Sequence, residues 1–258
     1  MKEALHVEWT KLRTVAGTVW LLAAVVLLTV ALGVATSAAV SCSGVGCGQD
    51  PAKISLTGIA FGQAVVAVLA VLAVGGEYST GMIRVTFAAI PRRSAVLAAK
   101  ASVISVLVLV AGATAVLVSV LAGRIILPGN GFTEANGHAV LSLADGPVLR
   151  AAVGSVLYLV LVGLLSLGVA TVVRDAATAI GIVLGLLYLF PVVAAVVSDP
   201  DWFDRLQRIS PMTAGLAVQA TTNLDSLPIG PWAGLGVLGL WAAGALSAGG
   251  LLLRLRDA

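Results

Sequence analysis

Charged side chains are scarce in this chain. Of 258 residues, 12 are Asp or Glu and 15 are Lys or Arg, which together make up 10% of the sequence. Soluble domains carry about 25% charged residues, so this composition excludes an ordinary soluble fold. Hydrophobic residues make up 59% and the mean hydropathy is +1.07. The composition therefore predicts a membrane protein.

The usual catalytic signatures are also missing. The chain has neither a G-x-x-x-x-G-K-[ST] phosphate loop nor an H-E-x-x-H zinc motif. Its two histidines, His6 and His138, lie outside the long apolar runs, which argues against an intramembrane Ser–His protease. We therefore expect this chain not to be an enzyme, to bind no cofactor or metal itself, and to have no nucleic-acid partner.

Six apolar runs are long enough to cross a membrane, which takes about 20 residues each. They predict one all-α, polytopic transmembrane domain over residues 1–258, with six transmembrane helices. The approximate limits of the runs are Gly17–Val40, Leu56–Gly76, Ala95–Ile126, Val148–Val173, Ala176–Val197 and Trp232–Leu253.

The distribution of Lys and Arg predicts the orientation. If the N-terminus is cytoplasmic, ten of these residues lie in or beside inner segments and five lie outside. Basic residues gather on the cytoplasmic side of membrane proteins. Both termini are therefore expected in the cytoplasm, with the chain in the plasma membrane.

Ionisable groups are nearly absent from the six runs. Charged residues occur only near the ends of the runs, and Glu77, at the cytoplasmic mouth of the second, is the nearest candidate for a gate. Ion-coupled carriers usually place such groups inside the membrane. We therefore expect no buried charge, a largely apolar pathway and an amphipathic or hydrophobic substrate, and an ATP-independent carrier is disfavoured.

The inner loop 77–93 is more elaborate than a simple turn. Ile83, Phe87 and Ile90 recur at helical spacing beside Met82, which predicts a short amphipathic helix. Two interpretations remain open: a docking helix for a cytosolic partner that supplies energy, or a helix lying on the membrane. In the second, three arginines would meet anionic lipid: Arg84, Arg92 and Arg93.

Two other segments outside the runs have helical patterns. Residues 1–16 place Leu5, Trp9 and Leu12 on one face, which favours a helix in the membrane interface over a plain start to the first span. In the outer loop 198–231, Asp199 before Pro200 predicts the start of a short helix that ends at Pro211.

Two cysteines fall in the first outer loop, Ser41–Ser55. Cys42 and Cys47 can form a disulfide on an oxidising side of the membrane, and the sequence leaves the bridge and two free thiols equally open. A metal site is disfavoured because no histidine lies near them in the sequence. His138 is expected to be a solvated loop residue.

Pairs of small residues four apart indicate where helices can pack closely, although 29 glycines make such pairs common by chance. The pairs are Gly181–Gly185, Gly230–Gly234 and Gly239–Ala243.

Three motifs give the chain a resemblance to a known family. They are EWTKLR at Glu8–Arg13, GEYSTGMIR at Gly76–Arg84 followed by Pro91-Arg92-Arg93, and SPMTAG at Ser210–Gly215. With the six-run layout, they make the chain resemble the permease subunits of type-2 ABC transporters, particularly actinobacterial ones.

The resemblance implies an exporter built from two identical or similar permeases and two ATP-binding subunits, which would hold ATP and Mg²⁺. Glu77 would lie at the gate end, and membrane lipid would surround the permeases. The residues implied to contact the ATP-binding subunit are Ser79, Met82, Ile83, Arg84, Phe87 and Ile90, with Arg174 and Asp175 as a smaller second contact. A membrane anchor or sensor that recruits a cytosolic protein without transport remains an alternative.

Overall fold

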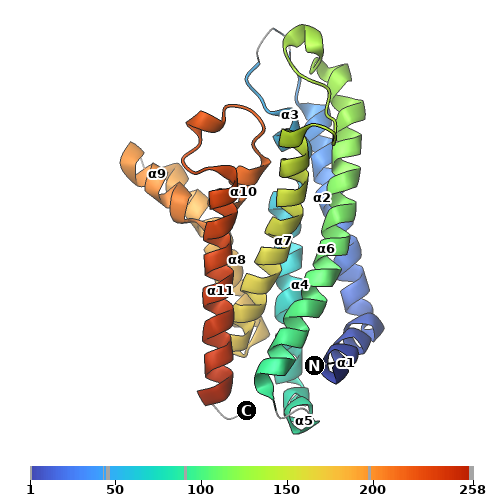
Figure 1. Cartoon of the computed structure of the whole chain (residues 1–258), viewed down its shortest axis with the longest axis vertical. Coiled ribbons are helices and arrows are strands. Elements are labelled where there is room, and N and C mark those ends of the chain that lie inside the picture. Colours follow the sequence, from blue (N-terminus) through green and yellow to red (C-terminus); the bar gives the residue numbers. More distant parts are fainter. Residues whose placement is uncertain (1, 43, 45–46, 90–91, 197–198, 256–258) are drawn as a thin grey trace.

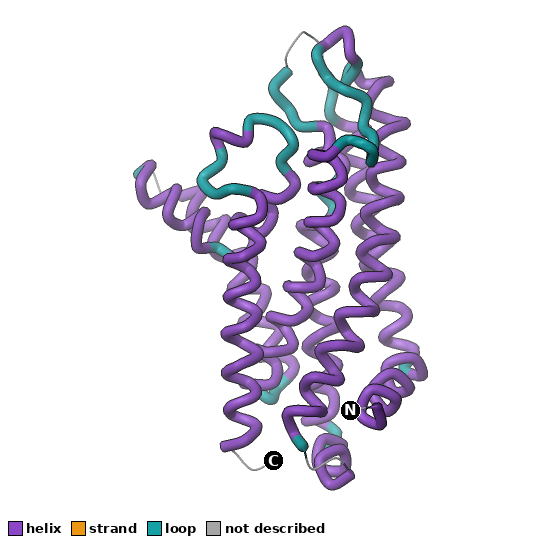
Figure 2. The backbone as a smooth tube through the Cα atoms, in the orientation of Figure 1, coloured by secondary structure: helices purple, strands orange, loops and turns teal. Residues whose placement is uncertain are grey.

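Six long helices form the body of the protein (Figures 1 and 2). The computed structural model describes residues 2–42, 44, 47–89, 92–196 and 199–255, and among these residues every regular element is a helix. All six long helices are apolar enough to cross a membrane, so the prediction of an all-α polytopic membrane protein is confirmed. They are α2 (Ala16–Ala39), α4 (Ile59–Ser79), α6 (Arg93–Ile126), α7 (Gly146–Val173), α8 (Ala176–Val196) and α11 (Pro231–Leu255).

The shorter helices lie at the two ends of the bundle (Figure 1). We call the end that carries α1 and α5 the inner end, following the predicted orientation, and the opposite end the outer end. The α-helices among them are α1 (Lys2–Thr14), α3 (Pro51–Ser55), α5 (Met82–Ala89), α9 (Pro200–Ile209) and α10 (Pro211–Leu216). The 3₁₀ turns are η1 (Leu127–Asn130), η2 (Glu134–Asn136), η3 (Ala217–Gln219) and η4 (Leu224–Ser226).

Helix α7 is the centre of the bundle. It packs against α4, α6, α8 and α11, and its side chains Tyr158, Leu159 and Leu167 are fully buried. In contrast, only 17% of the residues in the most apolar 18-residue stretch of α8 are buried, against 56% in α7. The outer faces of the peripheral helices are therefore apolar and available to lipid or to another protein.

The α2–α4 crossing depends on two glycines. A Cβ atom at Gly58 would lie 1.9 Å from the backbone oxygen of Thr29, and one at Gly62 would lie 2.2 Å from its Oγ1. Small residues allow such close approach in membranes, where packing drives helix association. Of the predicted pairs, only Gly234 makes a close contact of this kind, whereas Gly181 and Gly185 face open space.

Contacts between loops hold the outer end together. Asp50 Oδ1 caps α3 by accepting from the Ala52 amide (3.0 Å) and also accepts from Thr221 Oγ1 (2.7 Å). Asp199 caps α9 as predicted, accepting from the amides of Asp201 and Trp202 at 2.9 and 3.3 Å. One carboxylate, Asp50, therefore fixes the first outer loop to the last.

We predict that Gly58→Ala lowers the free energy of unfolding by about 1–3 kcal/mol, because the added methyl group would overpack the α2–α4 contact. Thermal unfolding in detergent measures the change. Gly185→Ala is the matched control: its Cβ would meet nothing within 4 Å, so stability should hold or rise. Equal effects of the two substitutions would contradict the assignment of this contact.

Candidate functional site at the inner end

The inner end brings together four elements that are far apart in the sequence. Helix α1, the last turns of α4, α5 and the first turns of α6 lie near one another there (Figure 1). Three of them, α1, α4 and α6, carry charged residues on their facing sides, although α4 and α6 are otherwise strongly apolar. We call this group the inner charge cluster; its members are Glu8, Lys11, Glu77 and Lys100.

Lys100 is the centre of the inner charge cluster. Its Nζ donates to Glu8 Oε2 at 2.8 Å, to Glu77 Oε1 at 2.7 Å and to the carbonyl oxygen of Ala73 at 3.2 Å. These three bonds use all three donors of an ammonium group. Since the side chains of Lys100 and Glu8 are each 3% exposed, this ion pair is shielded from water.

Lys11 extends the inner charge cluster to α5. Its Nζ lies 3.0 Å from Glu77 Oε1 and donates to Thr86 Oγ1 at 3.1 Å. It also lies 3.6 Å from Glu8 Oε1. Its side chain is 29% exposed, so it forms the solvent-facing edge of the cluster. A single ammonium group thus connects α1, α4 and α5.

The four charges balance, which allows burial. An unpaired ion in a protein interior costs several kcal/mol, and the cost falls only when partners and hydrogen bonds are provided. Two carboxylates and two ammonium groups supply that balance here. Among the described residues, however, Glu77 Oε2 is buried without a hydrogen-bond partner, so one acceptor of the cluster stays unused.

Helical spacing explains why each element contributes its charges at this point. Glu8 and Lys11 are three residues apart on α1, and Ala73 and Glu77 are four apart on α4, so each pair shares one face. Lys100 lies two turns into α6, on the side facing α1 and α4. Three helices therefore present charge inward at the same depth.

Comparisons with known proteins do not identify this arrangement. No family model and no curated protein matches the chain. The argument for function therefore rests on the inner charge cluster and on the surfaces next to it.

The expectation of no buried charge is wrong. Glu8, Glu77 and Lys100 are buried, and Glu77 is enclosed by two lysines instead of standing free at a mouth. Counting charges run by run missed this because the cluster is made between helices. The signals in the sequence were Lys100, near the start of the third apolar run, and the spacing of Glu8 and Lys11.

The predicted inner helix is present as α5, and Ser79, the first residue implied to contact a partner, lies before it. Ser79 ends α4, and Gly81, with φ +70°, makes the turn before Met82. Ile83 is buried, whereas Met82 and Arg84 are exposed. The Phe87 side chain and Ile90 lie outside the described residues.

The turn between α7 and α8 consists of Arg174 and Asp175, the residues implied as a second contact. Arg174 has a left-handed backbone, with φ 63°, and lies with its guanidinium 5.5 Å from the Tyr78 ring centroid. Asp175 is exposed and accepts from the Thr178 amide at 2.8 Å, and hydrogen bonding to Thr178 lowers its pKa. Asp175 is thus the more exposed residue of this turn.

The outer cysteines form a disulfide, and a histidine that is far from them in the sequence lies beside them in the structure. Cys42 and Cys47 are bonded, and His138 Nε2 lies 3.0 Å from Cys47 Sγ. His138 is half-buried, not a solvated residue. The loop 131–145 folds back over the first outer loop. This contact joins residues that are 91 positions apart, so the sequence did not indicate it.

We predict that Lys100→Met lowers the free energy of unfolding by about 3–5 kcal/mol, because it leaves a buried carboxylate without its counterion. Denaturation in mixed micelles measures this change. Lys53→Met, at an exposed lysine, is the control and should stay within about 0.5 kcal/mol.

Adding Glu8→Gln to Lys100→Met tests the pairing itself. The double variant should recover part of the loss, because Glu77 keeps Lys11 as a partner. Strictly additive losses would show that Lys100 and Glu8 do not interact energetically.

Proposed function

We propose that this chain is the permease subunit of an ABC-type export system, working as a pair and driven by separate ATP-binding subunits that dock on α5. The observation that supports this proposal is the division of α5 into two faces. Met82 and Val85 are 48% and 69% exposed, with Arg84 between them. The buried residues of α5 are Ile83 and Thr86, and Thr86 accepts the hydrogen bond from Lys11.

An apolar and basic surface on the inner side suits a protein partner. Exposed apolar residues flanked by arginine are typical of interface centres. Because Thr86 is bonded to Lys11, and Lys11 to Glu77, a force on α5 reaches α1 and α4 directly. Lys100 carries it on to α6. ATP-driven closure of the partner would in this way shift three helices together.

The pathway and the cargo follow from the surfaces of the bundle. Helix α8 exposes Leu189 and Val192 at 60% and 61%, and we assign this apolar face to the second permease. Substrate would pass between the two copies. Since the lining offered by these helices is apolar, the cargo in this proposal is amphipathic or hydrophobic, and ATP and Mg²⁺ stay in the partner subunit.

A second candidate function is an ion-coupled carrier that needs no ATP. The buried inner charge cluster favours it, because carriers keep ionisable groups at membrane depth. The cluster is nevertheless electrically balanced and lies at one end of the bundle. A recruiting anchor would use the same α5 surface without transport.

We predict that Val85→Asp weakens co-purification of an ATP-binding subunit encoded beside this chain by at least about tenfold. The reason is that it replaces an apolar contact at the centre of the interface with a carboxylate. Val140→Asp, at a residue of the outer end that is 42% exposed, is the matched control and should leave binding unchanged. Unchanged binding in Val85→Asp would remove α5 as the docking surface.

Docking and coupling can be separated at Lys11. We expect the Lys11→Met variant still to bind the ATP-binding subunit, because Lys11 is not on the exposed surface of α5. Substrate-stimulated ATP hydrolysis in vesicles should fall by about 5–150-fold, the factor that corresponds to a typical coupling free energy between two sites. Lys53→Met is the control. Transport without ATP or partner would favour the carrier, and binding of a partner with no transport would favour the anchor.

A further inference from the structure

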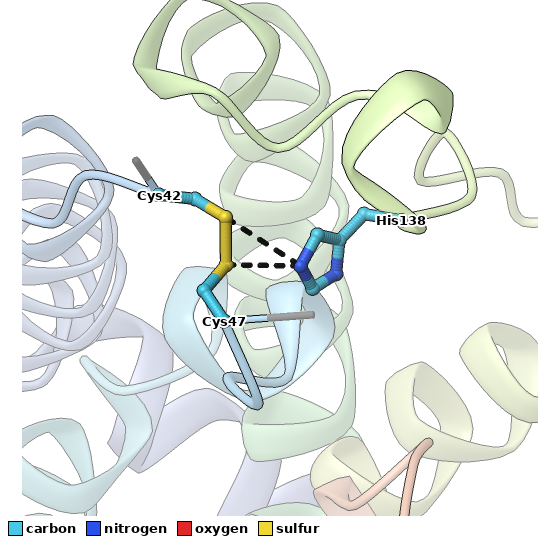
Figure 3. A group of neighbouring side chains, drawn as sticks. All are labelled: Cys42, Cys47 and His138. Atoms are coloured by element: carbon cyan, nitrogen blue, oxygen red, sulfur yellow. Dashed lines mark hydrogen bonds between the residues drawn. A yellow bond between two sulfur atoms is a disulfide. The ribbon is translucent and has the colours of Figure 1, made fainter. Parts of the chain in front are cut away.

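Three potential metal ligands meet at the outer end (Figure 3). Cys42 follows α2, Cys47 precedes α3, and His138 belongs to the loop after η2. The His138 Nε2 atom lies 3.0 Å from Cys47 Sγ and 3.8 Å from Cys42 Sγ. One donor atom from each residue lies within 4.8 Å of the other two.

The loops hold these residues in place through contacts that do not involve sulfur. The Cys42 amide donates to the carbonyl oxygen of Asn130 at 2.8 Å. Gly131, with φ +91°, packs on the Cys42 carbonyl so closely that a Cβ would lie 2.0 Å from that oxygen. The His138 amide donates to the Thr133 carbonyl oxygen at 3.1 Å, and its ring packs 5.1 Å from that of Phe132. The histidine is therefore positioned over the cysteines by the fold.

The imidazole of His138 gains little from its contact with the disulfide. A sulfur atom is only a weak hydrogen-bond acceptor. Two thiolates and one neutral imidazole, in contrast, are ligands that Zn²⁺ prefers. We propose that Cys42, Cys47 and His138 form a redox-gated site for a thiophilic divalent cation such as Zn²⁺: closed while the disulfide is intact and open once it is reduced.

The chemistry balances with a thiol reductant as the electron donor. Two thiols of the reductant give two electrons and two protons; the Cys42–Cys47 bond breaks to two thiols, and the reductant becomes a disulfide. Binding of Zn²⁺ then releases one proton from each cysteine. The two thiolates neutralise the ion, His138 Nε2 is the third ligand, and water takes the fourth position.

The geometry needs only side-chain adjustment. In a tetrahedral zinc site, sulfur ligands lie about 3.8 Å apart and a sulfur lies about 3.6 Å from a ring nitrogen, given the usual bond lengths. The His138–sulfur distances of 3.0 and 3.8 Å already bracket the second value. The Cα atoms of the cysteines are 5.8 Å apart, so rotation about χ1 can separate the sulfurs.

Metal binding would change which loops are crosslinked. The disulfide closes only the segment 42–47, whereas a bound ion would also tie His138, and thus the α6–α7 loop, to the first outer loop. The reduced, metal-bound protein would therefore still be crosslinked at its outer end, and the crosslink would include one more loop.

The test uses the full-length protein in detergent, with Co²⁺ as a spectroscopic probe and Zn²⁺ as competitor. After reduction and removal of the reductant, one equivalent of Co²⁺ should bind with thiolate charge-transfer bands, Zn²⁺ should displace it, and the oxidised protein should bind none. Zn²⁺ should also raise the Tm of the reduced protein only.

Variants identify the ligands. His138→Ala should weaken Zn²⁺ binding by at least about tenfold, and Cys47→Ser should abolish the charge-transfer bands, whereas His6→Ala, at an exposed histidine of the inner end, should change nothing. Equal metal binding in oxidised and reduced protein, no effect of His138→Ala, or a disulfide that resists reduction unless the protein unfolds would each overturn the proposal.

Discussion

Lys100 joins three helices through one buried ammonium group, and the inner end of the bundle depends on that contact. It meets Glu8 of α1, Glu77 of α4 and the Ala73 carbonyl. Such a cluster holds its helices in one arrangement because any separation would leave a charge unpaired in an apolar setting. In the proposed mechanism, these contacts would couple the movements of α1, α4 and α6.

The remaining parts of the bundle are held by other means. In the middle, close approach of Thr29 to Gly58 and Gly62 sets the α2–α4 spacing. At the outer end, Asp50 links the first and last outer loops, and the Cys42–Cys47 bond stands beside His138. An ion cluster, close glycine packing and a disulfide are therefore found at three different depths of the bundle.

The proposed function relies on the position of α5 between solvent and the inner charge cluster. Its exposed face offers apolar and basic side chains to a partner, while Thr86 is bonded to Lys11. The inner charge cluster also keeps an ion-coupled carrier as an alternative. Such carriers need buried ionisable groups, which the apolar runs alone did not indicate.

Local patterns in the sequence determined the fold class, the six spans and the α9 cap: hydropathy and run length indicated the spans, and Asp199 before Pro200 indicated the cap. The helical spacing of the apolar residues in the inner loop located α5 to within a few residues. Only the tertiary structure brought Lys100 to Glu8 and Glu77, selected Gly58 over Gly181 as a close contact, and placed His138 on the cysteines. These contacts join segments separated by tens of residues, and no periodicity within one segment encodes which face of another it will meet.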